Sequence, residues 1–531
     1  MKMLPKFLLS AAMVVTMATS FSAVQAATPP DTLVQAWQSD DIITLDPAEV
    51  FEFSASEIMG NTYERLVAYD IKDVSKIYGQ VAESWTVSPD GKTYTFKIKP
   101  NRKFASGNPI TAEDVVYSLH RAVTLDKTPA FILGQFGFTK DNVKDKIKQT
   151  GPMELTIEVD KPYAPTLVLY CLGNSVASIV DKKLVTQNEK DGDWGYSWLK
   201  TKHAGSGPYI MRDWKANEVL VLERNPNYEK KTPLARVIFR HIKETASQRL
   251  LLEKGDIDVA RSLNPEEITA VSKNPDIKIQ SAPKGTVYYL GLNQKNPNLA
   301  KPEVRQALKY LVDYQAIADT IMKYKGDVHQ NFLPKGFLGA ETNNPFRLDV
   351  AKAKELLAKA GLKDGFSVTM DTRSTSEIMG IAQAMQSTFA QAGIKLEILP
   401  MDSKQALTKY RARQHDIYIG NWGSDYQDPN SNADTFAANE DNSDNAKAKP
   451  LAWRNAWDPG PLTAKTRAAV MERDGEKRAQ MYKELQKSVA DDGPFVIFLQ
   501  QTEVAAVRKN VENFVLGPSF SDNDVSQTKK N

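Results

Sequence analysis

The chain has 531 residues and a mass of 59.1 kDa, a length that accommodates roughly two to four domains of ordinary size. Hydrophobic residues make up 41% and charged residues 25%, a composition that supports folded cores and excludes a disordered or fibrous chain. The net charge of +3 favours neither a nucleic-acid partner nor an anionic membrane surface. A single cysteine, Cys171, excludes an intrachain disulfide and multi-cysteine metal sites, and there are five histidines, so we expect no metal and no cofactor.

The first 26 residues have the pattern of a secretory signal peptide. Lys2 and Lys6 provide a positive start, an apolar run begins at Leu8, and Val24-Gln-Ala26 places small residues before a cleavage site. No later segment approaches 18 uninterrupted apolar residues, so we expect no membrane-spanning helix. The sequence therefore predicts a soluble protein that is exported to the bacterial periplasm.

The sequence pattern near residues 72–200 predicts antiparallel strands and a capped helix. Glu83–Val87 and Lys92–Lys99 alternate as strands around the turn sequence Ser88-Pro-Asp-Gly91. Thr111 is an expected N-cap for a helix that begins at Ala112 with acidic residues in its first turn. Gly205-Ser-Gly-Pro208 then marks the clearest internal break, and residues 209–223 beyond it predict a hairpin.

The second half of the chain alternates between helical and strand patterns. The following elements are expected: helices over Lys301–Met322, Val350–Ala360 with Asp349 as its N-cap, Ser376–Ala392 and Lys404–Ala412; strands over Phe366–Met370, Ile394–Ile398 (ended by Pro400) and Asp416–Trp422. Strands that alternate with helices of this length predict an α/β fold with a mainly parallel sheet.

The common signatures of enzymes are missing from the sequence. It contains no phosphate-binding Gly-x-x-x-x-Gly-Lys-Ser/Thr loop, no dinucleotide-binding Gly-x-Gly-x-x-Gly and no Gly-x-Ser-x-Gly nucleophile elbow. The five histidines form no His-x-x-x-His pair, and Cys171 lies in the apolar run Leu167–Leu172, which predicts a buried, inert thiol. We therefore expect a protein that is not an enzyme.

Residues 82–118 carry the motif that is most informative about the family. Ala82-Glu-Ser-Trp-Thr-Val-Ser-Pro-Asp-Gly, followed by Phe104-Ala-Ser-Gly-Asn-Pro-Ile-Thr-Ala-Glu-Asp-Val-Val-Tyr-Ser118, closely resembles the signature of the family 5 (cluster C) solute-binding proteins of ABC importers, which include oligopeptide- and dipeptide-binding proteins. One departure is Glu229, where the family often has an aromatic residue. The resemblance continues at Gly205-Ser-Gly-Pro-Tyr, Glu223-Arg-Asn-Pro-Asn-Tyr228, Leu290-Gly-Leu-Asn293, Val304-Arg-Gln-Ala-Leu308 and Trp422-Gly-Ser-Asp-Tyr-Gln-Asp-Pro429.

The resemblance implies a two-lobed periplasmic-binding-protein fold of type II, with an additional subdomain inserted in lobe I. The ligand would be enclosed when the lobes close about a hinge. The expected division is 1–26 signal peptide; 27–72, 203–284 and 501–531 lobe I; 73–202 inserted subdomain; 285–500 lobe II.

Two strands of the second half predict a binding edge. Ligands of open α/β sheets bind beyond the carboxyl ends of strands. Asp416–Trp422 delivers Gly423, Ser424 and Asp425 to that edge, and Phe366–Met370 delivers Arg373 to the same one. An acid and a base therefore arrive together.

The resemblance assigns roles to these residues. The spacing of Trp422 and Asp425 is similar to the family's peptide-binding loop, in which the aspartate pairs with the peptide's α-ammonium. Arg373 lies within one residue of the arginine that binds the peptide carboxylate in the dipeptide binder. Other interpretations stay open: Asp425 could bond only to local backbone, and Arg373 could be a surface or interlobe residue.

The cleft-lining segment of lobe I is expected at Val50–Ser54, again by resemblance. Main-chain hydrogen bonds from this segment, including Ser54, would hold an extended peptide without reading its side chains. Phe51, Phe53 and Trp422 could form walls of the cleft, although aromatic residues at such positions are core residues at least as often.

The sequence thus predicts the substrate-binding component of an ABC importer. It would bind short peptides between its lobes and deliver them to an inner-membrane ABC permease, and the family's usual form is a monomer. The alternative is the same receptor role for another solute: an opine, glutathione, a nickel chelate, heme or a short saccharide. Asp425 favours an amine-bearing ligand over a neutral sugar.

Overall fold

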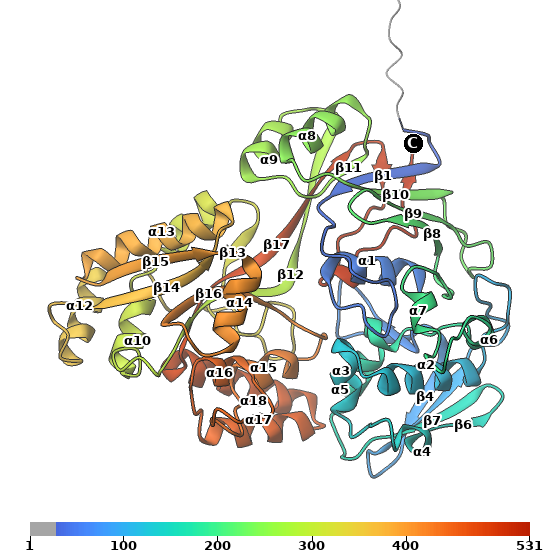
Figure 1. The fold of residues 1–531 in the computed structure, drawn as a ribbon, viewed down its shortest axis with the longest axis horizontal. Helices are drawn as coiled ribbons and strands as arrows, with labels where there is room; N and C mark the ends of the chain where they lie inside the picture. The colour runs from blue at the N-terminus through green and yellow to red at the C-terminus, as the bar shows by residue number, and fades with distance from the viewer. Residues whose placement is uncertain (1–27) are drawn as a thin grey trace, which may run out of the picture.

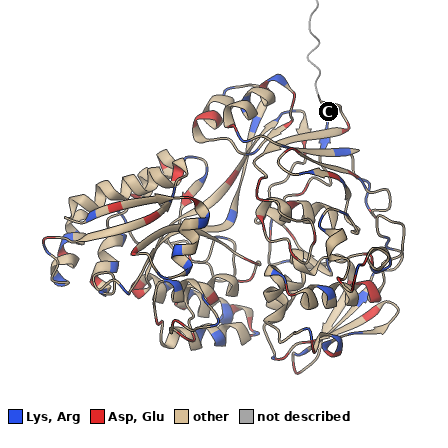
Figure 2. Cartoon of the chain, in the orientation of Figure 1, with Lys and Arg blue, Asp and Glu red and all other residues tan. Residues whose placement is uncertain are grey.

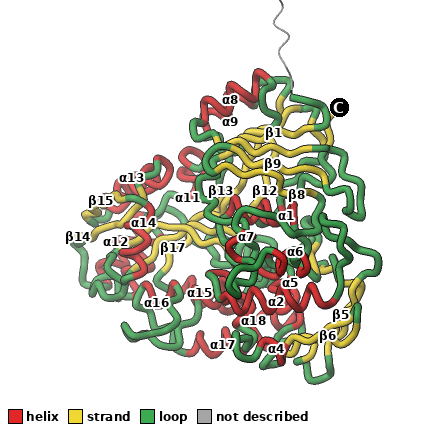
Figure 3. Tube along the Cα trace, turned by 45° about the vertical axis from the view of Figure 1, so that its right-hand side comes forward, coloured by secondary structure: helices red, strands yellow, loops and turns green. Residues whose placement is uncertain are grey.

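The structure is a computed structural model that describes residues 28–531, and the predicted signal peptide lies outside the described residues. Two bodies are joined by a pair of long antiparallel strands, β12 (Ile277–Leu292) and β17 (Phe495–Arg508) (Figure 1). These strands belong to a large sheet that extends through both bodies, visible as the band of strands in Figure 3. Its order is β15-β14-β16-β12-β17-β11-β1-β10-β9-β8, with β13 (Gly326–Val328) paired to β17.

Lobe I holds one end of this sheet and both ends of the described chain. Its hairpin β8–β9 was predicted and is confirmed. Helix α1 packs beneath the sheet and touches the short helix η4 near the C-terminus (Figure 1). The lobe I elements are β1 (Thr32–Trp37), α1 (Phe53–Thr62), β8 (Tyr209–Lys215), β9 (Val219–Arg224), β10 (Arg236–His241), α8 (Thr245–Lys254), β11 (Val259–Ala260), α9 (Pro265–Val271), β18 (Val511–Glu512), η4 (Phe520–Asp522) and β19 (Lys529–Lys530).

A four-stranded antiparallel sheet and several helices form the subdomain below lobe I. The predicted strands around Ser88–Gly91 are confirmed as β4 and β5, and Thr111 caps α2 through a reciprocal capping box with Asp114. The elements are β2 (Val67–Tyr69), β3 (Ile77–Gly79), β4 (Ala82–Val87), β5 (Thr93–Ile98), α2 (Ala112–Leu125), α3 (Phe131–Gly134), α4 (Val143–Lys146), β6 (Ile147–Gly151), β7 (Glu154–Glu158), α5 (Pro165–Leu172), α6 (Lys182–Gln187) and α7 (Tyr196–Leu199).

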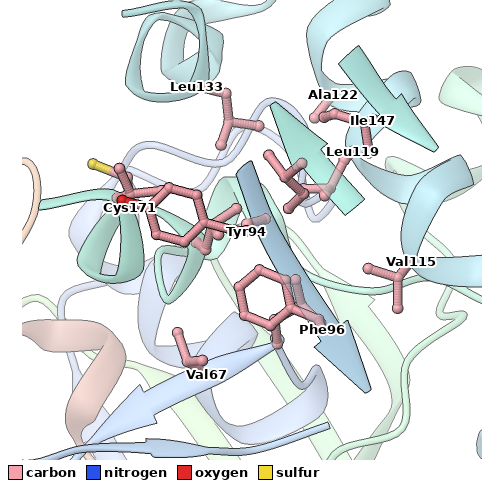
Figure 4. Close-up of a cluster of buried hydrophobic side chains, with 14 of the residues drawn as sticks. Val67, Tyr94, Phe96, Val115, Leu119, Ala122, Leu133, Ile147 and Cys171 are labelled. Carbon is pink, nitrogen blue, oxygen red and sulfur yellow. The ribbon is translucent and has the colours of Figure 1, made fainter. Parts of the chain in front are cut away.

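The subdomain has its own hydrophobic core between its sheet and α2, drawn in Figure 4. Tyr94 and Phe96 from β5 pack against Leu119 from α2. Cys171 is fully buried in the same cluster, as predicted, and burial raises the pKa of its thiol well above the usual value. A thiol in this environment stays protonated and inert.

Lobe II contains the predicted alternation of helices and strands. Asp349 caps α12 by accepting a hydrogen bond of 2.8 Å from the amide of Lys352. The elements are α10 (Pro302–Lys309), α11 (Tyr314–Ala316), the π-helix η3 (Ile317–Ile321), α12 (Val350–Lys359), β14 (Ser367–Arg373), α13 (Ser376–Gln391), β15 (Lys395–Met401), α14 (Ser403–Arg411), β16 (Ile417–Gly423), α15 (Asn430–Phe436), α16 (Leu451–Arg454), α17 (Pro461–Met471) and α18 (Gly475–Asp492).

Two local predictions for this half of the chain are wrong. The helix expected over Lys301–Met322 ends at Lys309, because Asp313 starts a new helix by accepting a hydrogen bond from the amide of Ala316. Pro400 does not end β15, which lies at the edge of the sheet, where a missing N–H costs no ladder bond.

The prediction of a mainly parallel sheet is also wrong. In the described chain, β14 pairs in parallel with β15 and β16, and β1 pairs in parallel with β10 and β11. The pairs formed by β12 with β16 and β17, and by β17 with β11, are antiparallel. The two strands that cross between the lobes, together with the antiparallel pairs of β9 with β8 and β10, therefore make this a mixed sheet.

The crossing point of β12 and β17 contains an irregularity in their pairing. Register is lost between Pro283 and Val287, so Lys284, Gly285 and Thr286 stand outside the regular ladder. Such bulges bend strands locally, which suits a hinge. The predicted division of the chain at residues 72, 202, 284 and 500 stays a proposal; the bulge lies at its third boundary.

A buried network of charges surrounds this crossing. Glu503 of β17 is ion-paired with Arg261 and, at 2.7 Å, with Lys284 of β12. Arg261 also contacts Glu57 of α1 at 2.5 Å, and Asn523 bridges the two carboxylates. Burial alone would raise the pKa of Glu503, but Arg261 and Lys284 hold it below the usual value. The network thus binds lobe I, both crossing strands and the C-terminal segment together.

Basic and acidic residues both occur along many elements of the described chain. Lys and Arg alternate with Asp and Glu over the visible elements of both lobes (Figure 2). Within residues 28–531, no helix combines the length and apolar character needed to cross a bilayer.

The network predicts a large stability difference between two glutamates. Glu503→Gln leaves the two buried cations Arg261 and Lys284 with Glu57 as their one remaining carboxylate, so a buried positive charge is uncompensated and we expect a loss of about 3–5 kcal/mol in the free energy of unfolding at pH 7. The matched control Glu512→Gln breaks the exposed pair with Lys529, keeps an oxygen that can accept from Asn531, and should change the free energy of unfolding far less. Because the pKa of Glu503 is lowered in the fold, its contribution is present above the unfolded pKa and lost as the pH falls through the folded one.

Denaturant unfolding of both variants at pH 7 and pH 3 measures these effects. Equal costs for the two variants at pH 7, or a Glu503→Gln penalty that grows in acid, would contradict the role assigned to the network.

Candidate ligand-binding site

A cavity of about 490 Å³ lies between the lobes, a size within the range of small-molecule sites. Its walls come from segments far apart in the sequence. Lobe I and the subdomain provide Val50, Phe51, Phe53, Ser56, Tyr69, Phe131, Tyr170, Gly173, Asn174, Ser175 and Pro518–Ser521; the crossing provides Lys284, Gly285 and Thr286; lobe II provides Tyr289, Arg373, Leu407, Tyr410, Arg411, Tyr418, Asn421–Gln427 and Arg454.

The lobe II wall is built at the ends of two parallel strands. β14 and β16 run side by side with Asp371 opposite Tyr418, so their carboxyl ends meet at the cavity. Arg373 ends β14, and its Nη2 donates to the hydroxyl of Tyr418 at 3.3 Å and to Oδ1 of Asn421 at 3.2 Å. Its Nε is buried without a hydrogen-bond partner in the described chain. Trp422 lies on the same wall, and its buried Nε1 also has no hydrogen-bond partner in the described chain.

Asp425 is held in place through its backbone and not through its carboxylate. Its amide donates to the hydroxyl of Ser431 at 2.7 Å, and its carbonyl accepts from Nδ2 of Asn174 in the subdomain, also at 2.7 Å. Within residues 28–531 the carboxylate forms no ion pair and no hydrogen bond. Burial raises its pKa to about 7, Asp434 adds to the rise, and Arg454 opposes it. The residue keeps some exposed area on the cavity wall, so a cation in the cavity can reach it.

Asp428, three residues later, contrasts with Asp425. It is fully buried and accepts hydrogen bonds of 2.7 and 2.8 Å from the two Nη atoms of Arg478 in α18. One aspartate of the loop is therefore a structural anchor, while the other faces the cavity without a partner.

Gly423 and Ser424 connect the loop to the crossing strands. The amide of Ser424 donates to the carbonyl of Gly285 at 2.8 Å, and its hydroxyl lies 2.7 Å from Oδ1 of Asn432. At Gly423, an added Cβ would lie 3.3 Å from the ring of Phe53 and 3.4 Å from Oγ1 of Thr286. The absence of a side chain here lets the lobe II loop approach lobe I closely.

The lobe I wall is aromatic. Phe51 and Phe53 remain 41% and 45% exposed, and both line the cavity. The ring of Phe53 stacks on Phe520 at a centroid distance of 4.6 Å, and Phe51 meets Phe131 edge to face. Ser54 does not line the cavity, because α1 begins at Phe53 and its first turn buries Ser54, whose amide donates to Asp41.

Several lining residues were not predicted from the sequence. Tyr410 and Tyr418 stack at 4.0 Å on the lobe II side, Phe520 comes from the C-terminal segment, and Arg411 and Arg454 come from helix ends. The alternation of β16 could have indicated Tyr418. Nothing local marks Phe520, Arg411 or Arg454, because the fold brings them to the cavity from distant segments.

The lobes also touch at the end of the cavity away from the crossing. The amide of Ala164 donates to the carbonyl of Val470 at 3.0 Å, and Tyr426 and Val470 of lobe II join the buried cluster of the subdomain. Figure 1 shows α5 of the subdomain beside the helices α15 and α18 of lobe II. The described arrangement is thus one in which the lobes are in contact. No group of three or more His, Cys, Asp or Glu placed to hold a metal ion occurs in residues 28–531.

Comparison with known proteins shows to which family the chain belongs. The family model described as "Bacterial extracellular solute-binding proteins, family 5 Middle" matches residues 76–444. The chain belongs to the family 5 bacterial extracellular solute-binding proteins. Its fold is the two-lobed type II periplasmic-binding-protein fold, as predicted. The structure of the periplasmic binding protein DppA from Helicobacter pylori in complex with the peptide STSA has a TM-score of 0.76 at 24% identity, over 94% of this chain and 98% of that chain.

Curated relatives of this family 5 protein match nearly its full length. The probable D,D-dipeptide-binding periplasmic protein DdpA of Escherichia coli is 30% identical over 94% of this chain and 95% of its own length. The glutathione-binding protein GsiB of Salmonella paratyphi A is 24% identical over 96% of this chain and 97% of its own. These relatives are named as binding proteins.

The environment of Asp425 predicts a pH-dependent stability. An acid whose folded pKa is about 7 stabilises the fold below its unfolded pKa near 4, and this contribution is lost as the pH rises through 7. Asp425→Asn cannot ionise, so we expect its melting temperature to rise relative to the wild type between pH 5 and pH 8. Thermal unfolding of the ligand-free proteins measures the difference.

Asp428→Asn is the control from the same loop. It weakens a buried ion pair, so it should lower the melting temperature at both pH values. If the offset between Asp425→Asn and the wild type is the same at pH 5 and pH 8, Asp425 is not the desolvated acid of the cavity.

Proposed function

We propose that this protein is the periplasmic substrate-binding component of an ABC importer and that it binds short peptides in the cavity between its lobes. It would be exported by the signal peptide at residues 1–26, act as a monomer, and deliver the peptide to an inner-membrane ABC permease. It would perform no catalysis. The named peptide-binding relatives and the family 5 membership support this role.

The observation that carries the proposal is the set of unpaired polar groups on one wall of the cavity. The carboxylate of Asp425 has no cation partner, and Nε of Arg373 and Nε1 of Trp422 have no acceptor within the described residues. Buried polar groups are normally satisfied, so such groups indicate a missing partner. An ammonium for Asp425 and a carboxylate for Arg373 are the two ends of a peptide.

The cavity walls suit the rest of such a ligand. The aromatic rings of Phe51, Phe53 and Phe520 offer apolar surface without specific hydrogen-bond demands. This allows variation in peptide side chains, whereas the charged groups would fix the two termini. A cavity of about 490 Å³ suits a short peptide better than a long one.

The second candidate is the same receptor role for a non-peptide solute, such as an opine, glutathione, a nickel chelate, heme or a short saccharide. The relative named as a glutathione-binding protein supports the glutathione form of this alternative. The unpaired Asp425 favours solutes that carry an amine over neutral saccharides.

The ammonium contact of Asp425 can be tested by a double cycle. Asp425→Asn removes the charge but keeps the shape, and an N-acetylated peptide removes the matching charge from the ligand. Breaking one partner of a desolvated pair costs about 2–5 kcal/mol, hence on the order of 30-fold or more in Kd. Because both changes delete the same interaction, we expect the two penalties not to add. Calorimetry on the four combinations measures the cycle.

Simple summation of the two penalties, or full affinity of the wild type for the acetylated peptide, would show that Asp425 is not the partner of the ammonium. Asp441→Asn serves as the matched control: Asp441 is an exposed acid that follows α15 and does not line the cavity. It should bind the free and acetylated peptides as the wild type does.

The irregular pairing at Lys284–Thr286 predicts motion between the lobes. A ligand that contacts both walls stabilises the arrangement in which the lobes touch. We therefore expect a saturating peptide to reduce the radius of gyration in solution scattering. Unchanged scattering profiles with and without bound peptide would contradict closure about this hinge.

A further inference from the structure

The cavity carries more positive charge than the two ends of a peptide require. Arg373, Arg411 and Arg454 line it, and none of the three forms an ion pair with a carboxylate in residues 28–531. Lys284 also lines it but is neutralised by Glu503. Asp425 is the one acid among the described lining residues. After Asp425 is matched by an ammonium and Arg373 by a carboxylate, two arginines remain.

Several buried arginines outside the cavity form ion pairs with carboxylates. The buried guanidinium groups of Arg121, Arg261 and Arg478 each contact at least one buried carboxylate. A crowded cation without a counter-charge is unfavourable, so the unpaired arginines that line the cavity are candidates for binding a ligand anion; Arg65, which is also buried without an ion pair in the described chain, does not line it.

The terminal nitrogens of the Arg454 guanidinium are not used in hydrogen bonds within the described residues. Its guanidinium lies over the ring of Tyr410 at 5.6 Å, and its Nε donates to the carbonyl of Lys449 at 3.1 Å. Its two Nη atoms donate no hydrogen bond within the described residues. A guanidinium oriented through Nε and a ring face in this way presents its terminal nitrogens for bidentate binding of a carboxylate.

Arg411 is the last residue of α14, its side chain is exposed, and it lines the same cavity as Arg454. Burial lowers the pKa of Arg411, and the positive charge of Arg454 lowers it further. Two neighbouring cations repel each other, and a bound anion between them removes that repulsion. The pair thus has the charge and the donors of an anion subsite.

We propose that Arg411 and Arg454 form a second anion subsite, so that the preferred ligand carries one ammonium and two carboxylates. This inference rests on the proposed function, because it assigns Asp425 and Arg373 to the two peptide ends. Two sources share this chemistry: a dipeptide with an acidic side chain, and glutathione.

The test compares each ligand with a matched one that lacks the second carboxylate. Ala-Glu and Glu-Ala are paired with Ala-Gln and Gln-Ala, and glutathione is paired with its monoethyl ester. For the wild type we expect the doubly anionic member of at least one pair to bind about 10-fold tighter or more, as for a charge-assisted bidentate contact. In Arg411→Gln/Arg454→Gln this ratio should fall to about 1, while the singly anionic ligands keep their affinity. Whether Ala-Glu, Glu-Ala or glutathione binds most tightly identifies the source.

Lys404→Gln is the matched control, since Lys404 is an exposed cation of the same helix that does not line the cavity. It should retain the wild-type ratio, and Arg454→Lys, which keeps the charge but loses the fork, should lose most of it. Melting temperatures near that of the wild type show that the variants fold.

Equal wild-type affinities within every pair, or a ratio unchanged in the double variant, overturn the subsite but leave the proposed peptide receptor intact. If no dipeptide binds and glutathione discriminates against its ester, the subsite holds and the peptide assignment fails. Absence of binding by every ligand of the set overturns both.

Discussion

The structure depends on the buried contact of Glu503 with Arg261 and Lys284 at the point where β12 and β17 cross. Any motion between the lobes must pass through this crossing, because these two strands join them. The charges fix the lobe I side of the crossing to α1 and to the C-terminal segment. Next to Lys284, the carbonyl of Gly285 accepts a hydrogen bond from the amide of Ser424, which lies beside Asp425 in the loop after β16. The crossing and the loop that carries Asp425 are therefore directly hydrogen-bonded, so a ligand that moved this loop would also act on the crossing.

Charge is distributed in two ways in this molecule. In the framework, several buried acids and bases are matched: Asp46 with Arg121, Asp428 with Arg478, and Glu57 with Arg261. On the cavity wall, Asp425, Arg411 and Arg454 have no such partners in the described chain. Matched pairs stabilise one arrangement, whereas unmatched groups keep a differential affinity for a ligand. The same residue types thus have opposite consequences, and the difference lies in what the fold places beside them.

Local sequence patterns were sufficient to predict many helices and strands, but not how these elements pair and pack. Caps such as Thr111 and Asp349 are predictable because a cap and its amides lie within a few residues of each other. The antiparallel pairing of β12 with β17 is not predictable in this way. About two hundred residues separate the two strands, and no short sequence pattern specifies their register. The same limit applies to the site. Trp422 and Asp425 lie in one motif, but Phe520 and Arg454 reach the cavity only through the tertiary fold.

The loop that follows β16 shows why a motif cannot by itself assign function. Asp425 and Asp428 lie three residues apart, and either could be read as the acid that binds a ligand ammonium. The structure separates them through a distant residue: Arg478 of α18 satisfies both oxygens of Asp428, and nothing in the described chain satisfies Asp425. The anchored aspartate holds the loop against lobe II, and this rigidity keeps the other carboxylate at the cavity wall despite the cost of desolvation. The carboxylate of Asp425 can remain unpaired because that of Asp428 is paired.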